Sequence, residues 1–349
     1  MGQVTFIVVL SALSSVYLIW GMTTLPKERW QIAATVPVRK GGNGHWQGVN
    51  LTWYGILTAN AYLAAVLLAL ILMGAAGISL RAIMALVILL LACCVPASRL
   101  VAQVVEKKSN TFTVGGAVFV GTLIAPWVVM LVNNIPVGDQ GTPVPVLPAL
   151  AALAIAYAFG EGFGRLACVS FGCCYGKPLS SCHPRVARLA SPFALVFTGK
   201  TKKIAYASGL DGVAVMPVQG MTYLLYTVTG IVSSWLFLHA AFGAAFLTAL
   251  TVTQLWRVCS EFLRDDYRGA GKFSAYQSMG VVAVAYGIWT VRHFSAETAV
   301  VNLPAGIEGI WNPVPLLMMQ GIWAAIFLYT GLSRVTGARM SFHVQAKKI

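Results

Sequence analysis

Long apolar runs separated by short polar segments make up most of the chain. A run of about 18 or more apolar residues is long enough to cross the hydrocarbon core of a bilayer as a helix. The pattern therefore predicts an all-α polytopic integral membrane protein with about nine transmembrane helices. They are expected at residues 4–24, 52–76, 82–98, 111–132, 146–171, 216–238, 242–262, 275–292 and 315–333.

The composition agrees with this pattern and excludes an ordinary soluble protein. Hydrophobic residues make up 58% of the chain and charged residues only 10%, and the mean hydropathy is +0.77. No basic segment and no clear cleavage site accompany the first apolar run, so we expect a retained helix rather than a signal peptide. The one long polar loop, 172–215, is long enough to form a lid or a small head.

The net charge of +14 is distributed unevenly between alternate loops. One set of loops, with the C-terminal tail, holds nearly all the basic residues, and the other holds only Arg81 and Arg292. The positive-inside rule then places 172–215 and the tail in the cytoplasm. Many short basic loops favour contact with anionic lipid headgroups and argue against nucleic acid as a partner. The basic set is Lys27, Arg29, Arg39, Lys40, Arg99, Lys107, Lys108, Arg185, Arg188, Lys200, Lys202, Lys203, Arg264, Arg268, Lys272, Arg334, Arg339, Lys347 and Lys348.

Ionisable residues stand at the end of the fifth apolar run, where a charge in hydrocarbon costs about 3 kcal/mol or more. Glu161 and Arg165 are one helical turn apart and can pair. Four glycines, Gly160, Gly162, Gly164 and Gly172, leave the backbone approachable for a ligand or a neighbouring helix. An arginine at this depth suits a phosphate, because its planar fork binds two oxygens at once.

A second polar cluster ends the seventh run. Gln254, Arg257, Glu261 and Arg264 follow one another at intervals of three or four residues, which places all four on one helical face. Two arginines around one glutamate leave a net positive stripe. Such a stripe is consistent with an anion site, and also with an interhelical salt bridge whose ends reach toward water.

Single polar residues mark three other predicted helix starts. Tyr54 follows a tryptophan at the start of the second run, where aromatic residues usually anchor a helix at the interface; its hydroxyl could also meet a headgroup. Gln219 heads a stripe with Tyr223 and Tyr226 on the sixth run. Gln277 opens the eighth run.

Cysteines gather around the end of the fifth run. The spacing of Cys168, Cys173, Cys174 and Cys182, with His183, departs from the paired spacing of common zinc sites. Three alternatives stay open: a metal site, a disulfide from Cys182 to Cys173 or Cys174, and free thiols that pack near the site.

Five short segments occur in a fixed order at the ends of these helices. In that order they resemble the motifs of the prolipoprotein diacylglyceryl transferase family, over about residues 51–292. The segments are Thr52-Trp53-Tyr54-Gly55, Gly115-Gly116 through Gly121-Thr122, Gly164-Arg165 through Gly176, Met216-Pro217-Val218-Gln219, and Arg257 through Arg264 followed by Gln277.

The resemblance implies a membrane enzyme of the bacterial inner (plasma) membrane with a multi-pass core. The core would span 51–292, flanked by an additional N-terminal helix and polar loop in 1–50 and an additional C-terminal helix and basic tail in 293–349. The implied reaction transfers a diacylglyceryl group from phosphatidylglycerol, or another anionic phospholipid, to a thiol, in the family the lipobox cysteine of a prolipoprotein. No metal or other cofactor is implied.

The resemblance also suggests roles for the residues that match its motifs. Arg165 and Arg257 are expected to clamp the leaving phosphate. The other expected catalytic residues are Glu261 and Tyr54, and the expected substrate-binding residues are Arg264, Gln219, Glu161, Gly164, Gly176 and Gln277.

The chain departs from the family motifs at several polar positions. The family's histidine is Val120 here, its asparagines are Cys168 and Phe171, and its glutamate is Cys173. The arginines survive better than the acid–base groups. A different, cytoplasmic acceptor and a non-catalytic lipid or anion transporter therefore remain alternatives. Family enzymes place the signature loop on the outer face, whereas the loop charges place it inside.

Overall fold

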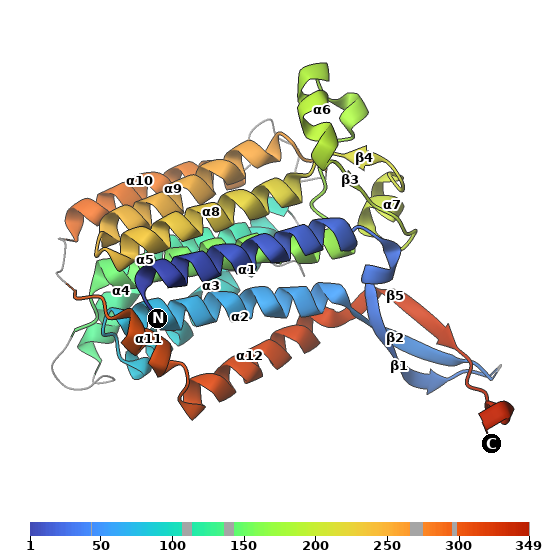
Figure 1. Cartoon of the computed structure of the whole chain (residues 1–349), viewed down its shortest axis with the longest axis horizontal. Coiled ribbons are helices and arrows are strands. Elements are labelled where there is room, and N and C mark those ends of the chain that lie inside the picture. The colour runs from blue at the N-terminus through green and yellow to red at the C-terminus, as the bar shows by residue number, and fades with distance from the viewer. Residues whose placement is uncertain (43, 107–113, 136–142, 266–274, 295–298, 349) are drawn as a thin grey trace.

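The computed structural model describes the whole chain except residues 43, 107–113, 136–142, 266–274, 295–298 and 349. Within that part, eight helices are long and apolar enough to cross a membrane. They run roughly side by side along the long axis of the molecule (Figure 1). The predicted polytopic all-α class is therefore confirmed. The eight helices are α1 (Gln3–Thr24), α2 (Trp53–Ala75), α3 (Leu80–Glu106), α4 (Val114–Asn134), α5 (Val146–Phe171), α8 (Val218–Leu238), α9 (Phe242–Glu261) and α12 (Pro313–Gly331).

Helix α5 is the most deeply buried of the eight and forms the centre of the bundle. It packs against α2, α8 and α9. Its first half is rich in alanine, and Ala149, Ala151 and Ala152 are fully buried. Small side chains let neighbouring backbones approach, which is how helices associate inside a membrane.

Two expected spans differ in detail from the observed helices. The third, expected at 82–98, is the longer helix α3, which continues through Pro96. The eighth coincides with α10 (Ala275–His293), which packs against α9 and α4 but is not among the eight helices. The short helix α11 (Leu303–Gly309) leads into α12 and packs on α2.

A small sheet extends from the end of the bundle at which α1 finishes and α2 begins (Figure 1). It contains β1 (Ile32–Lys40), β2 (Trp46–Thr52) and β5 (Leu332–Met340), antiparallel in the order β1-β2-β5. The sequence reading treated these segments as a polar connection and a plain basic tail. β1 and β2 form a local hairpin across residues 41–45, whereas β5 reaches β2 from the other end of the chain, a pairing that local sequence does not reveal.

The 172–215 loop folds as the small head that its length allowed, at the same end of the bundle (Figure 1). The basic loops among the described residues lie at this same end of the bundle. Four of the basic residues, Lys107, Lys108, Arg268 and Lys272, lie outside the described residues. The head contains η2 (Leu179–Ser181), α6 (Pro184–Ala190), η3 (Ser191–Phe193), β3 (Leu195–Val196), α7 (Lys203–Ser208) and β4 (Ala214–Val215), and η1 (Glu28–Trp30) and η4 (Ala346–Lys348) are the remaining short turns.

One buried lysine joins this head to the bundle. The Lys202 ammonium donates hydrogen bonds to the carbonyl oxygens of Leu25 at 3.1 Å and Ser170 at 2.6 Å. Burial lowers the pKa of Lys202 to about 8, because the charged form loses hydration. The lysine therefore connects the ends of α1 and α5 to the head.

Candidate functional site

The site is built on one face of α5. Tyr157, Glu161 and Arg165 follow one another at intervals of four residues, so their side chains lie on the same side of the helix. The Arg165 guanidinium donates to the Glu161 carboxylate, which confirms the pairing expected from the sequence. Both side chains are largely buried, with 15% and 13% of their surfaces exposed.

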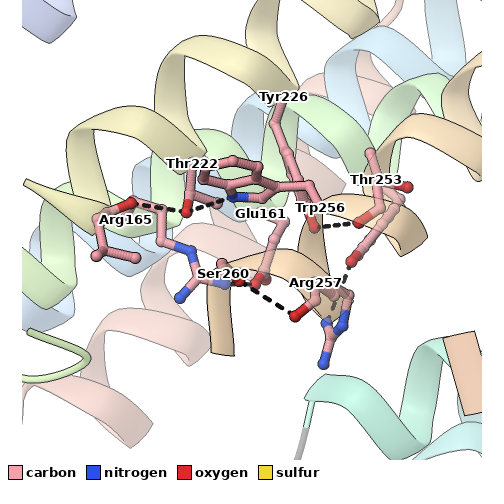
Figure 2. Close-up of polar contacts among 10 residues, drawn as sticks. Glu161, Arg165, Thr222, Tyr226, Thr253, Trp256, Arg257 and Ser260 are labelled. Carbon is pink, nitrogen blue, oxygen red and sulfur yellow. Dashed lines mark hydrogen bonds and ion pairs between the residues drawn. The ribbon is translucent and has the colours of Figure 1, made fainter. Parts of the chain in front are cut away.

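Arg257 approaches the same face from α9. Its guanidinium donates to the Tyr157 hydroxyl at 3.3 Å and interacts electrostatically with Tyr226 and Glu161. Figure 2 shows Glu161 between Arg165 and Arg257. The two arginines that the sequence left on separate helices thus meet around one carboxylate.

Gly115 makes room for Arg257. A Cβ atom at this position would lie 2.5 Å from Nη2 of Arg257 and 2.8 Å from Cδ1 of Tyr276. Gly115 belongs to one of the five segments that resemble the family motifs. The space that Gly115 leaves open is filled by the end of the Arg257 side chain.

Hydrogen bonds hold α8 and α9 in register beside these arginines. The Trp256 indole donates to the Thr222 hydroxyl at 2.8 Å, and the Tyr226 hydroxyl donates to the Thr253 carbonyl at 2.8 Å. The Ser260 hydroxyl donates to the Arg257 carbonyl at 3.2 Å (Figure 2). Fixed neighbours keep a long arginine side chain oriented, which lowers the entropy cost of binding.

Three cysteines meet where α5 ends. The sulfur atoms of Cys168, Cys173 and Cys174 all lie within 4.8 Å of one another. Hydrogen bonds from the Cys168 and Cys173 thiols hold the pKa of the Cys174 thiol well below its usual range, whereas the pKa of Cys173 is raised. Cys182 is a free thiol directed to the Pro178 carbonyl at 3.5 Å.

Gln219 supports this cluster from α8. Its side-chain amide donates to the Cys173 carbonyl at 2.9 Å. Its amide oxygen is buried and has no hydrogen-bond partner among the described residues. Tyr54 packs edge-on against Phe171, with ring centroids 5.7 Å apart, and interacts electrostatically with the three cysteines.

The remaining expected site residues have mostly structural contacts. Gly176 forms a backbone bridge with Arg264, and a Cβ at 176 would lie 2.5 Å from the Met216 carbonyl oxygen. Arg264 interacts electrostatically with Cys174. A Cβ at Gly164 would meet its nearest neighbour at an ordinary 3.9 Å. Their contacts with a substrate stay predictions.

Two further assignments concern α9 and α10. Gln277 donates to the Val258 carbonyl at 3.2 Å and so ties α10 to α9. Glu261 is the last residue of α9, and its catalytic role stays a prediction. The sequence reading missed Tyr157, although its four-residue spacing from Glu161 was a usable signal.

The long apolar helices define an integral membrane protein. Arg165 and Arg257 give it a cationic site near one end of these helices. A family model for prolipoprotein diacylglyceryl transferase matches residues 45–292, which is more than half of the chain. The chain therefore belongs to that family, and the resemblance expected over about 51–292 is confirmed. No curated protein matches the chain. Membership supports a lipid-modifying transferase of this type in a membrane.

Proposed function

We propose that the protein transfers a diacylglyceryl group from phosphatidylglycerol to the lipobox cysteine of prolipoproteins in the bacterial inner membrane. The observation that carries this proposal is the arrangement of Arg165 and Arg257 around Glu161. Two guanidinium groups and one carboxylate leave one positive charge in a largely buried place. An anionic phosphate compensates that charge.

Arg165 retains hydrogen-bonding capacity for such an anion. Its Nε atom is buried and has no hydrogen-bond partner among the described residues. An unpaired buried donor costs about 1–3 kcal/mol, so a phosphate oxygen that accepts from it is favoured. The planar fork also fixes the orientation of the phosphate, which a lysine does not.

The depth of the arginines suits a lipid headgroup. At about 1.5 Å per residue, Arg165 lies about 9 Å from the end of α5 at Phe171, and Arg257 about 6 Å from the end of α9 at Glu261. The interfacial region of a bilayer is roughly 5–8 Å thick on each side. Arg257 lies within that depth and Arg165 just below it, so a phosphate at the inner edge of the interface is within reach of both long side chains.

The proposed step balances with the groups that the chain supplies. The acceptor sulfur, as a thiolate, attacks the glyceryl carbon that bears the phosphate. A carbon–sulfur bond forms, the carbon–oxygen bond breaks, and its electron pair leaves with glycerol phosphate. Arg165 and Arg257 stabilise the developing charge on that phosphate. The thiol proton goes to the Glu161 carboxylate or to water.

A second candidate has the same donor and a cytoplasmic thiol or amine as acceptor. It is favoured by the loop charges, which place the basic end of the bundle inside the cell. A transporter is the candidate from another class. It would move the lipid or anion without changing it, which a product measurement distinguishes.

The test is an incubation of membranes containing the protein with labelled phosphatidylglycerol and a synthetic lipobox peptide. We expect a peptide heavier by one diacylglyceryl group, together with free glycerol phosphate. A peptide with serine in place of the cysteine is the control. A labelled product on another thiol or amine supports the second candidate. Intact labelled phospholipid and an unmodified peptide, with the lipid moved between leaflets, support the transporter.

A further inference from the structure

The cluster of Cys168, Cys173 and Cys174 has no role in the mechanism proposed above. Its three sulfur atoms come from a single helix end and lie within 4.8 Å of one another. Cys168 and Cys174 are partly exposed, the Cys173 thiol is the buried one of the three, and none forms a disulfide. An ion can therefore reach them, and all three can bind it as thiolates.

The backbone holds the three thiols together before any ligand arrives. Gly172 has the left-handed φ of 72° and ends α5. The amides of Gly172 and Cys173 both donate to the Cys168 carbonyl, at 2.9 and 3.0 Å, which folds the chain back over the helix end. Cys174 itself has a φ of 56°, and Gln219 fixes the Cys173 carbonyl. A preformed donor set of this kind lowers the ordering cost of metal binding.

We propose that Cys168, Cys173 and Cys174 bind a zinc ion whose fourth position takes the thiol of the acceptor. Thiolate ligands select soft or borderline ions such as zinc rather than magnesium or calcium. Structural zinc sites are closed by four protein ligands, whereas three protein ligands and an open position are typical of catalytic zinc. Only three thiols converge here among the described residues.

The surroundings carry the charge that such a complex needs. Three thiolates and one zinc ion give a net charge of −1, and a bound acceptor thiolate makes it −2. The guanidinium groups of Arg165 and Arg264 both interact electrostatically with the Cys174 thiol. Tyr54 interacts with all three cysteines from α2. An anionic zinc–thiolate complex would therefore meet positive charge and a hydroxyl donor.

The inference deepens the proposed function and rests on it for the identity of the acceptor. Zinc would bind the acceptor sulfur as a thiolate at neutral pH, and the displaced thiol proton would go to water. The sulfur then attacks the glyceryl carbon, and glycerol phosphate leaves with the electron pair. The thioether product has a neutral sulfur, which is a weaker ligand and dissociates. Zinc would thus activate the acceptor thiol in a chain that lacks the family's histidine and glutamate, because Val120 and Cys173 stand at those positions.

The first experiment measures metal rather than activity. Protein purified without chelator and then exposed to zinc should retain about one zinc per chain. In Cys174→Ala the zinc affinity should fall by about 100-fold or more, because even changes outside the ligand set cost 10–100-fold. The matched control is Cys182→Ala, which should retain the metal. Equal zinc binding by the wild type and by Cys174→Ala would overturn the inference and would leave the transferase proposal standing.

A second measurement needs no variant, so a folding defect cannot obscure it. Cobalt in place of zinc should give the charge-transfer absorption of thiolate ligands in the wild-type protein. Adding the cysteine lipobox peptide should change the visible cobalt bands, whereas the serine peptide should not. No thiolate band refutes the metal site, and a band that the cysteine peptide leaves unchanged refutes the open fourth position. A metal site without any lipid product would retain the metal assignment and remove the proposed function.

Discussion

Glu161 is the residue on which the site converges, because it pairs with Arg165 and faces Arg257. With Glu261 and Arg264 at the end of α9 included, three arginines and two glutamates still leave one positive charge. Buried charges are tolerated only when they are paired or functional. The excess positive charge at this point is therefore the clearest signature of an anion site in the described residues.

Replacing either arginine with alanine should lower the transfer rate by about 100-fold or more, as the loss of one transition-state donor does in other enzymes. Lysine at position 165 or 257 should recover little, because it cannot form the bidentate fork. The measurement is the initial rate of lipid transfer to the peptide. Arg185→Ala, which changes an exposed arginine of the head, is the control. Wild-type rates in both alanine variants would disprove the clamp.

Gly115→Ala should lower activity without unfolding the protein. The new Cβ would lie 2.5 Å from Nη2 of Arg257, and this flexible end can move aside. A displacement of about 1 Å in a catalytic group can cost up to 100-fold in rate, so we expect at least about a tenfold loss of kcat/KM. Gly321→Ala is the matched control, because no atom outside its own helix lies within 4 Å of that Cβ. Unchanged kinetics in Gly115→Ala would show that the position of Arg257 is not critical.

The buried ammonium of Lys202 gives stability a defined pH dependence. Its pKa falls to about 8 in the folded protein from an ordinary 10.5, so between these values the unfolded chain binds more protons. This contribution to stability therefore rises as the pH increases from 8 to 10.5. In detergent, the unfolding temperature of the wild type relative to that of Lys202→Met should rise as the pH increases from 8 to 10.5.

The control for this measurement is Lys200→Met, which changes an exposed lysine of the same head. It should shift the unfolding temperature equally at pH 8 and pH 10. Parallel curves for the wild type and Lys202→Met would contradict the depressed pKa.

At the scale of elements, α2 joins the family core to the C-terminal segment outside the matched region. Gly55 of α2 meets Gly331 at the end of α12, and Gly74 meets Gly306 of α11. Each pair brings two backbones into contact, as small residues do at helix interfaces in membranes. α12 is thereby held at the start of α2, and α11 at its end.

Gly55→Ala should destabilise this contact. Its Cβ would lie 2.2 Å from the Gly331 Cα, and backbone atoms cannot rotate away as a side-chain end can. Overpacking of this kind costs about 1–3 kcal/mol, which should appear as a lower unfolding temperature. Gly321→Ala on α12 again provides a helix glycine with open space. An unchanged unfolding temperature in Gly55→Ala would mean that α12 adjusts freely.

At the scale of the whole molecule, the site, the head, the sheet and the described basic loops share one end of the bundle (Figure 1). The positive-inside rule predicts that this end faces the cytoplasm. A phosphate site, however, attracts basic residues to its own side, whichever side that is. The family resemblance favours the outer face.

Labelling of single added cysteines with an impermeant reagent decides the orientation. Lys200→Cys lies in the head and Glu308→Cys lies on α11 at the other end, and both positions are exposed. We expect Lys200→Cys to react in intact cells, as a lipoprotein acceptor requires. Each cysteine is added to a variant in which the native cysteines are replaced, and that cysteine-free variant sets the background. Reaction of Glu308→Cys instead, with Lys200→Cys labelled only after lysis, would direct the search to a cytoplasmic acceptor.

The sequence alone determined the class of the protein, most of its spans and the two polar helix faces. These features are local: run length sets a span, and three- or four-residue spacing sets a face. The same spacing sufficed for the Glu161–Arg165 pair, and it would have sufficed for Tyr157.

Only the tertiary structure decided which of these faces meet. The packing of α9 on α5 brings Arg257 to Glu161, and a left-handed turn at Gly172 brings three cysteines together although they are spaced unlike a common zinc motif. The sheet depends on β2 pairing with strands from both ends of the chain. The α5–α9 and β2–β5 contacts join residues far apart in sequence, and the cysteine cluster depends on a chain reversal, so none of these arrangements follows from a local periodic pattern.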